Sequence, residues 1–562
     1  MQNLRRLAGV VALLLSHAAL SDVHTLPATY KFKPNAEIDA VFAKFDSTTS
    51  PGCSAAAAQD GKLVYSRGYG MANLDHGVPI TPQTPFHVAS VSKQFTAAAV
   101  VLLAQDGKLS LDDDVRKYLP EVPDFGTPIT LAQMIHHTSG LRDQWDLLNL
   151  AGWRYSEDRI SDADVLRLMV RQRKLNFTPG SQYLYSNMGY TLLALVVQRV
   201  SGQTLREFTT ERIFKPLEMT NTHFRNDHAE IVPGFANGYE RADDSFRTDV
   251  TNFDTTGATS LVTTPEDLLR WDENFYTGKV GGKAFTDKMV QRATLNDGSS
   301  IAYATGVTHG TYRGLPTISH GGSDAGYRST VRHFPNQHFG IAVTCNIAEA
   351  RPDELADRFA DVFLAAQLQP KDSDTKKPVK EPKLNVKSLR AMAGLYFSRS
   401  DGQVIRIVEK DGKLQRTSQE GTNPRPLVAL DQNRFRVENY PQELLFSGEG
   451  AQRVITTKFA DQKAVTLQWM PEFAPTAAEL NEYVGLFGSE ELDSRYRMQI
   501  TDGKLYVATL RRVPLEMKPV TKDVFATWEI GTVIFKRDAG GRIAGFSVTS
   551  GRAMDNEFVK LP

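Results

Sequence analysis

The chain has 562 residues, more than a single hydrophobic core supports, so we expect several domains. Lys plus Arg and Asp plus Glu each number 65, and this balance carries no electrostatic signature of binding to nucleic acid or to an anionic membrane. The two cysteines, Cys53 and Cys345, are too few for a structural zinc site or a disulfide scaffold. The composition is that of a soluble globular protein, with an enzyme as the leading class.

The chain begins with a short apolar segment. Arg5 and Arg6 precede the largely apolar stretch of 14 residues at 7–20. A membrane-spanning helix needs about 20 residues, whereas a basic start followed by a short apolar core is typical of a cleavable secretory signal. We expect residues 1–21 to be a signal peptide, with a buried N-terminal helix as the alternative. No cysteine lies directly after the segment, so the prediction is a periplasmic or secreted protein without a lipid anchor.

A first large domain is predicted over residues 30–368. Strand-like segments lie near both of its ends and helical segments lie between them, which indicates an α+β domain whose sheet joins distant parts of the chain. The predicted elements, in chain order, are a hairpin around Gln59–Gly61, helices over Ala89–Ala104 and Tyr190–Val200, and strands at His320–Gly322, Tyr327–Phe334 and Phe339–Asn346.

Residues 369–388 contain three prolines and six lysines without periodicity, which predicts a linker. Short alternating strands follow, and Asp411–Leu414 recurs as Asp502–Leu505, an offset of 502 − 411 = 91 residues. We expect two antiparallel β-barrel repeats, at 389–474 and 475–562. One larger barrel built from both copies is the alternative.

The helix predicted from Ala89 opens with a serine and a lysine three residues apart. Ser90 and Lys93 therefore lie on one face, beside the free N–H groups and partial positive charge of a helix N-terminus. A serine hydroxyl is a poor nucleophile until a neighbouring group accepts its proton, and an amine can do this. The same spacing recurs in the linker at Ser373–Lys376, so the helical context carries the argument.

Two further groups fit the same chemistry. Tyr185 and Asn187 follow a turn and precede the second predicted helix, so both can face one cleft. A tyrosine flanked by cations can lose its proton below its usual pKa and act as a base, and an amide can bind a substrate carbonyl. His320 and Gly322 lie at a strand start, where glycine permits close approach of a substrate backbone.

These three groups, Ser-x-x-Lys, Tyr-x-Asn and His-x-Gly in that order, resemble the motifs of the penicillin-recognising serine hydrolases. That superfamily includes class C β-lactamases, DD-carboxypeptidases, D-aminopeptidases and related esterases. The resemblance implies a β-lactamase/transpeptidase-like domain, in which an antiparallel sheet is flanked by helices and accompanied by a helical subdomain. Two small C-terminal β-barrels resemble the D-aminopeptidase type.

The resemblance also implies a role for each motif residue. Ser90 would be acylated, Lys93 and Tyr185 would move its proton, and no metal or other cofactor would take part. An oxyanion hole would use the backbone N–H groups of Ser90 and Ser323. The catalytic residues expected are Ser90, Lys93 and Tyr185, and the substrate-binding residues are Asn187, His320, Gly322 and Ser323.

The third motif departs from the β-lactamase version, which is Lys-Thr-Gly. With His320 the hydroxyl is lost and the charge becomes titratable, so any hold on a substrate carboxylate should fade above a pKa of about 6.5. This favours a peptidase or amidase acting on D-amino-acid peptides or amides, resembling D-aminopeptidases or DD-carboxypeptidases. A β-lactamase or carboxylesterase on the same fold, or a slowly deacylating penicillin-binding sensor, remains the alternative.

The resemblance further places the strands of Cys53 and Cys345 close together in the sheet. An exported protein meets oxidising conditions, which permits a disulfide between them. Two buried free thiols are the other outcome. The adjacent His136 and His137 have no acidic or cysteine partners at metal-ligand spacing, and a structural role is expected for both.

Overall fold

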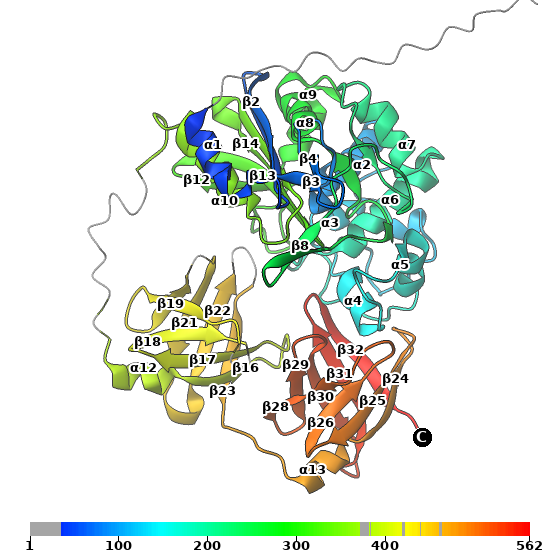
Figure 1. The fold of residues 1–562 in the computed structure, drawn as a ribbon. Helices are drawn as coiled ribbons and strands as arrows, with labels where there is room; N and C mark the ends of the chain where they lie inside the picture. The colour runs from blue at the N-terminus through cyan, green and yellow to red at the C-terminus, as the bar shows by residue number, and fades with distance from the viewer. Residues whose placement is uncertain (1–34, 371–381, 383, 419–421, 439, 460–462) are drawn as a thin grey trace, which may run out of the picture. The chain divides into compact units, whose positions relative to one another are not determined.

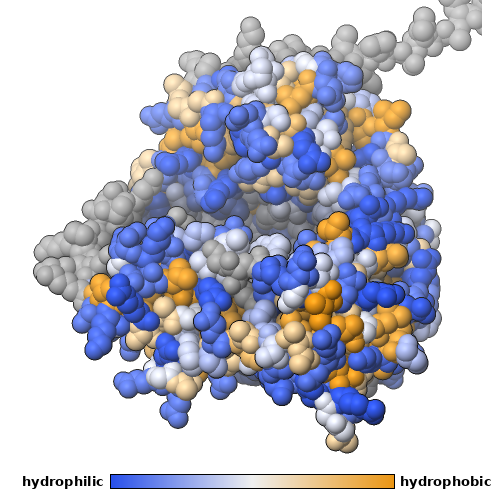
Figure 2. All heavy atoms as spheres, turned by 60° about the horizontal axis from the view of Figure 1, so that its bottom comes forward, coloured by the Kyte–Doolittle hydropathy of each residue, from blue (hydrophilic) through white to orange (hydrophobic). Residues whose placement is uncertain are grey.

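The computed structural model describes residues 35–370, 382, 384–418, 422–438, 440–459 and 463–562. The predicted signal peptide and most of the predicted linker lie outside these residues. Within the described part of the chain, no helix combines the length and apolar character needed to cross a membrane. Hydrophilic residues dominate the face drawn in Figure 2, where hydrophobic ones form small scattered groups.

An antiparallel six-stranded sheet joins the first and last strands of the first domain, as the sequence predicts (Figure 1). Its N-terminal hairpin pairs with the later strands through β1 and β15. In sheet order the strands are β12 (Thr308–Tyr312), β13 (Leu315–Asp324), β14 (Tyr327–Phe334), β15 (Phe339–Cys345), β1 (Cys53–Gln59) and β2 (Lys62–Tyr69).

A disulfide bond links two neighbouring interior strands of the sheet. Cys53 and Cys345 face each other in the β1–β15 register, with their Cα atoms 4.0 Å apart, and their sulfur atoms are bonded. Of the two outcomes left open by the sequence, the structure has the bridge. The bond closes a loop of 292 residues and so restricts the unfolded chain.

Each face of the sheet is covered by helices. Helices α1 (Ala36–Phe42) and α10 (Pro352–Phe363) lie together on one face (Figure 1). Helix α8 (Pro265–Thr277) packs on the other. Alternating side chains of a strand point to opposite faces, so Ala55 joins the core under α10 while Ala56 joins the core under α8.

A helical region packs beside α8 around two long apolar helices, α2 (Ser92–Gln105) and α6 (Asn187–Ser201). Helix α2 is buried from Ser92 to Leu103, which explains why its sequence is apolar on every side over residues 97–103. The other helices are α3 (Leu131–Ile135), α4 (Gln144–Leu150), α5 (Asp162–Met169), α7 (Leu205–Thr209) and α9 (Gly282–Val290), with helical turns η1 (Ala43–Phe45), η2 (Ala89–Val91), η3 (Val115–Lys117), η4 (Thr210–Phe214) and η5 (Pro335–Gln337).

Short strands complete the first domain in four small sheets. The three-stranded sheet β5-β11-β7 lies next to the Ser90 turn, because the Val88 N–H donates to the Leu261 carbonyl at 3.0 Å. The strands are β3 (Met71–Asn73), β4 (Val78–Pro79), β5 (Phe86–His87), β6 (Ile160–Ser161), β7 (His223–Phe224), β8 (Tyr239–Ala242), β9 (Ser245–Thr248), β10 (Phe253–Asp254) and β11 (Leu261–Thr263).

The first C-terminal repeat is a closed eight-stranded antiparallel barrel preceded by helix α12 (Val386–Met392). A 3-10 turn, η6 (Gly450–Gln452), precedes its seventh strand. The strands are β16 (Gly394–Phe397), β17 (Val404–Lys410), β18 (Lys413–Thr417), β19 (Arg425–Ala429), β20 (Arg434–Val437), β21 (Gln442–Ser447), β22 (Val454–Phe459) and β23 (Val465–Met470).

The second repeat is a nine-stranded antiparallel sheet preceded by helix α13 (Ala477–Glu482). Its end strands, β27 and β28, follow each other in the chain, so the barrel is nearly closed. The two repeats form separate sheets, and the larger-barrel alternative is wrong. The strands are β24 (Gly485–Ser489), β25 (Ser494–Thr501), β26 (Lys504–Ala508), β27 (Leu515–Glu516), β28 (Lys518–Thr521), β29 (Val524–Thr527), β30 (Gly531–Arg537), β31 (Ile543–Ser550) and β32 (Ala553–Lys560).

The second repeat shares its apolar core with the helical region. Leu147 and Leu150 of α4 belong to the same buried cluster as Tyr496 of β25. The Tyr496 hydroxyl donates to the Leu150 carbonyl at 2.8 Å. Arg142, just before α4, pairs with Glu491 at 3.2 Å, and both side chains are buried. These contacts bring the last part of the chain against the start of α4.

Candidate active site

Ser90 lies on the 3-10 turn η2, immediately before α2. The sequence predicts an α-helix from Ala89, but Ala89 has a φ of +48°, in the left-handed region that a residue with a Cβ seldom adopts. Such strain costs about 1–2 kcal/mol and persists only where the surrounding structure enforces it. The turn leaves the Ser90 side chain half-buried beside a cavity.

Lys93 lies fully buried on the first turn of α2 and points at the serine. Its Nζ is 3.1 Å from Ser90 Oγ, and it also donates to Asn187 Oδ1 at 2.8 Å and to the Ala258 carbonyl at 2.6 Å. Burial lowers the pKa of Lys93 to about 7, although the carboxylates of Asp324 and Asp143 oppose this. The amine is therefore neutral in a substantial fraction of molecules near pH 7 and can accept the Ser90 proton.

Tyr185 lies beside Ser90, but its protonation differs from the expectation. Burial raises the pKa of Tyr185 well above 10, and a hydrogen bond to Ser90 offsets this only in part. Two cations do lie near the ring, with Lys93 Nζ 4.9 Å and the Arg552 guanidinium carbon 5.4 Å from its centroid. Desolvation outweighs them, so the expected depressed pKa is wrong. Tyr185 stays protonated and can pass a proton on as an acid.

Asn187 is the first residue of α6 and joins Lys93 to a carboxylate. Its Oδ1 accepts from Lys93, while its Nδ2 and backbone N–H both donate to Asp143 Oδ2, at 2.8 and 2.7 Å. These contacts fix the amide orientation, because only the oxygen can accept from the lysine. Sequence reasoning missed Asp143, whose position before α4 reads as an ordinary helix N-cap.

His320 lies on β13 in a buried, uncharged form. Burial, with a smaller effect from Lys93, lowers the pKa of His320 to about 4. Its Nδ1 is 2.7 Å from the Gly321 carbonyl and its Nε2 is 3.0 Å from the Tyr303 hydroxyl. A neutral ring that donates from Nδ1 and accepts at Nε2 satisfies both contacts. The expected transition near pH 6.5 therefore belongs near pH 4.

Gly322 is required by packing against the turn that carries Ser90. A Cβ at Gly322 would lie 2.2 Å from the Val88 carbonyl oxygen and 2.4 Å from Ser329 Oγ. Ser329 Oγ itself donates to the Val88 carbonyl at 2.8 Å. The absent side chain lets β13 approach η2 closely, which brings Ser323 to the same cavity as Ser90.

A cavity of about 730 Å³ brings most of the predicted site residues together. Six of them line it, and Lys93 lies buried behind Ser90. Trp145 and Tyr155 supply aromatic surface, and Arg328 and Arg552 supply cations. The predicted residues that line the cavity are Ser90, Tyr185, Asn187, His320, Gly322 and Ser323.

Asp324, at the end of β13, is a second buried carboxylate that sequence reasoning missed. Burial would raise the pKa of Asp324, but hydrogen bonds led by His87 outweigh it and hold the pKa below its usual value. His87 Nε2 is 2.9 Å from Asp324 Oδ2, and Tyr155 and Thr259 also donate to this carboxylate. The group is a fixed negative charge on the cavity wall.

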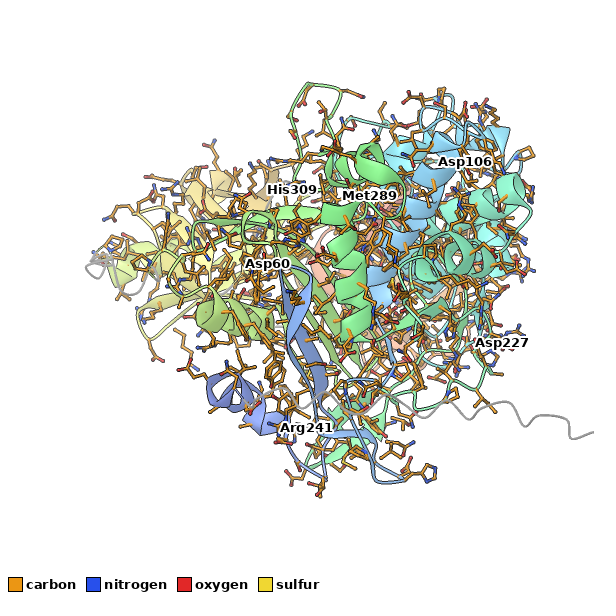
Figure 3. The ribbon with its side chains drawn as sticks, turned by 90° about the horizontal axis from the view of Figure 1, so that it is seen from above. Asp60, Asp106, Asp227, Arg241, Met289 and His309 are labelled. Atoms are coloured by element: carbon orange, nitrogen blue, oxygen red, sulfur yellow. A yellow bond between two sulfur atoms is a disulfide. The ribbon has the colours of Figure 1, made fainter. Side chains whose placement is uncertain are left out.

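The two adjacent histidines, His136 and His137, are buried or partly buried and make contacts with the backbone. Burial lowers the pKa of both His136 and His137, and His137 Nδ1 accepts the Ser186 N–H at 3.1 Å. Among the described residues, one cluster places three possible metal ligands together, Asp227, His228 and Asp254. Asp254 already pairs with Arg159 and with His228, and Figure 3 shows Asp227 at the margin of the ribbon. The cluster is not part of the cavity.

Comparison with known proteins identifies the family to which the chain belongs. Residues 38–366 match the family model described as Beta-lactamase, which is more than half of the chain, so the chain belongs to that family of serine hydrolases. A D-aminopeptidase from Gluconobacter oxydans is 26% identical over 482 residues, covering 85% of this chain and 86% of the relative. A D-aminopeptidase from Cereibacter sphaeroides is also 26% identical over 482 residues, covering 84% and 87%.

The octameric penicillin-binding protein homologue from Pyrococcus abyssi shares the fold, with a TM-score of 0.54 and 20% identity over 85% of this chain and 97% of that structure. The predicted superfamily and α+β fold class, with two C-terminal barrels, are therefore confirmed.

Proposed function

We propose that this serine hydrolase is an exported peptidase or amidase that cleaves D-amino-acid peptides or amides through an acyl-Ser90 intermediate. The observation that carries the proposal is a buried lysine of lowered pKa, 3.1 Å from a serine, in a cavity whose third motif holds a neutral histidine. The D-aminopeptidase relatives, aligned over most of both chains, support the substrate class.

In the proposed reaction, the neutral Lys93 amine takes the Ser90 proton while Ser90 Oγ attacks the substrate carbonyl. The backbone N–H groups of Ser90 and Ser323 stabilise the negative oxygen of the tetrahedral intermediate. The proton then passes from Lys93 through the protonated Tyr185 hydroxyl to the leaving amine as the C–N bond breaks. In the second half, water attacks the acyl carbon and gives its proton to the neutral Lys93 amine. The C–Oγ bond then breaks, Ser90 Oγ takes the proton from Lys93, and the carboxylic acid leaves.

Asn187 and His320 are proposed to bind substrate as uncharged groups, an amide and a neutral imidazole. Asn187 is held between Lys93 and Asp143, and His320 is neutral above a pKa of about 4. A β-lactamase site of this superfamily has a fixed cation at the His320 position, which attracts the carboxylate of a penicillin. The neutral ring lacks this attraction for a carboxylate, so we favour amide hydrolysis over β-lactamase activity.

The proposal is tested by presenting three substrates separately: a D-alanyl amide, a short-chain ester and benzylpenicillin. Turnover is followed together with the intact mass of the protein. We expect the wild type to turn over the amide, and we expect Ser90→Ala to lose both this turnover and any covalent adduct. Rapid turnover of penicillin alone would instead identify a β-lactamase, ester turnover alone a carboxylesterase, and a persistent penicillin adduct without turnover a sensor.

Export is part of the proposal and rests on the basic and apolar N-terminal sequence. We expect the chain isolated from outside the cytoplasm to lack about the first 21 residues, in line with signal cleavage near small side chains. N-terminal sequencing of that material tests the expectation, and an intact N-terminus on cytoplasmic protein would contradict it.

A further inference from the structure

The second C-terminal repeat contributes a side chain to the cavity. Arg552 lies in the turn between β31 and β32, 552 − 90 = 462 residues after Ser90, and lines the cavity with it. Its guanidinium carbon is 5.4 Å from the centroid of the Tyr185 ring. The side chain is about one-third exposed, at 35%. A domain without the catalytic motifs therefore reaches the reacting groups.

The backbone of this turn is fastened to the start of α4. The Arg552 N–H donates to Asp146 Oδ2 at 2.7 Å, and its carbonyl accepts from the Asp143 N–H at 3.2 Å. Gly551, with a φ of +49°, lies so close that a Cβ would be 2.7 Å from Asp146 Oδ1. The turn thus has a defined place beside α4, which fixes where the Arg552 side chain begins.

The Arg552 side chain is connected to Lys93 through two other side chains, those of Asp143 and Asn187. Arg552 Nη2 is 3.3 Å from Oδ1 of the fully buried Asp143. The other oxygen of Asp143 accepts from Asn187 Nδ2 at 2.8 Å, and Asn187 Oδ1 accepts from Lys93 Nζ at 2.8 Å. Each contact is within hydrogen-bond or ion-pair distance, so the chain of contacts from Arg552 to the amine is continuous.

Several charged or titratable groups face Lys93. Burial has the largest effect and lowers its pKa; the carboxylates of Asp324 and Asp143 raise the pKa, and Arg552 lowers it. His137 and His320 have lowered pKa values and are neutral near pH 7. The aromatic neighbours are the rings of Tyr185 and Tyr190, with centroids 4.9 and 5.6 Å from Nζ. Arg552 is therefore the cation that offsets Asp143.

We propose that Arg552 is a positioning residue for proton transfer at Ser90, which pairs with Asp143, holds Asn187 against Lys93 and keeps the lysine amine available to the serine. The inference rests on the proposed roles of Ser90 and Lys93. A direct role as receptor for a substrate carboxylate is the competing use of this cation. It is less favoured because Arg552 Nη2 and Nε already face Asp143 and Asp146, at 3.3 and 3.7 Å.

The test uses full-length protein and a neutral short-chain nitrophenyl ester, with kcat/KM measured between pH 5 and 9. In Arg552→Gln the carboxylate of Asp143 acts on Lys93 unopposed. We expect the acid limb to move to higher pH by about 0.5–1 unit and kcat at pH 7 to fall about two- to sixfold, with a smaller change in KM. Arg552→Lys keeps the charge and should keep the limb within about 0.2 unit of wild type.

Arg512→Gln is the matched control. Arg512 also comes from the second repeat and also holds the α4 region, through the Asn149 side chain and the Trp153 carbonyl. It should lower the midpoint of thermal unfolding without moving the acid limb. Asp143→Asn should move the limb the opposite way, to lower pH, and provides a second variant if Arg552→Gln does not fold.

An unchanged acid limb in folded Arg552→Gln would overturn the inference. So would a shift of equal size in Arg512→Gln, or an upward or absent shift in Asp143→Asn. The carboxylate-receptor role is checked with one D-alanyl peptide ending in a free carboxylate or in an amide. If only the carboxylate form loses activity in Arg552→Gln, the positioning role is wrong. Absence of acylation at Ser90 in the wild type would overturn the proposed function itself, whereas the other outcomes would leave it standing.

Discussion

At the scale of single residues, the protonation of Lys93 governs the proposed reaction. Burial lowers the pKa of Lys93 to about 7. Below that pH the ammonium form dominates and cannot accept the Ser90 proton; above it the amine can. We therefore expect kcat/KM for a neutral amide to rise through about pH 7 and then level. An acid limb near the unperturbed lysine pKa of about 10.4 would contradict the assignment of Lys93 as base.

His320 makes a separate prediction at this scale. The pKa of His320 is about 4, so the ring carries no charge between pH 5.5 and 9. The ratio of kcat/KM for benzylpenicillin to that for a neutral short-chain ester, which has no group that titrates in this range, should stay low and flat. His320→Lys places a cation beside the cavity and should raise the ratio at about pH 8 by roughly tenfold. A wild-type ratio that increases steeply below pH 7 would show that His320 titrates where the structure holds it neutral.

Some features of single site residues could be predicted from the sequence and others could not. Ser90, Lys93, Tyr185 and Asn187 were predicted together because each lies in a short motif at a helix start. Asp143 was not, because an aspartate before a helix is explained by N-capping alone. The depressed pKa expected for Tyr185 failed for another reason. Local sequence shows which cations lie near a hydroxyl but not how fully it is desolvated.

At the scale of elements, local signals located the turns and missed one backbone conformation. The repeated Asp-Gly pairs at 411–412 and 502–503 form the two-residue turns of β17–β18 and β25–β26, with all four φ angles positive. The helix predicted from Ala89 instead begins at Ser92, after a 3-10 turn. Packing of Val88 against Gly322 shapes that turn, and these two residues are 322 − 88 = 234 positions apart in the chain.

The β1–β15 pair carries the element-scale prediction. Replacing Cys53 and Cys345 together by alanine removes the bridge between these two neighbouring strands of the sheet. We expect the free energy of unfolding to fall by about 3–5 kcal/mol, since the bond closes a long loop. Acylation at Ser90 should persist in the folded variant, because neither cysteine lines the cavity. Denaturant titration and mass labelling measure the two effects, and an unchanged unfolding midpoint would contradict the first.

At the scale of the whole molecule, the recurrence of Asp411–Leu414 as Asp502–Leu505 predicted two C-terminal β units, and the structure contains two. Their relation to the first domain was beyond the sequence. Nothing local to Arg552 distinguishes it from a solvated arginine, and its partners Asp143 and Asp146 lie about 400 residues earlier. Long-range pairing of this kind has no signature in composition or periodicity.

The shared core predicts that the first domain depends on the second repeat. A chain ending within residues 370–385 would expose the surface of α4 that packs near Tyr496 and would lose the buried partner of Arg142. We expect the truncated chain to unfold at a lower temperature than the full chain and to be acylated more slowly near pH 7. Equal thermal stability and an equal acylation rate would reduce the second repeat to a passive attachment.

Ser90 is the proposed nucleophile of an enzyme acting on D-amino-acid amides. The most direct test of this proposal is acid-quenched turnover of D-alanyl p-nitroanilide, followed by peptide mass mapping of the wild type and of Ser90→Ala. We predict a D-alanyl adduct on the peptide containing Ser90 and p-nitroaniline release that falls by several orders of magnitude in the variant, because nucleophile and base act as a unit. Release by Ser90→Ala above a few per cent of the wild-type rate, or an adduct on another residue, would contradict the account.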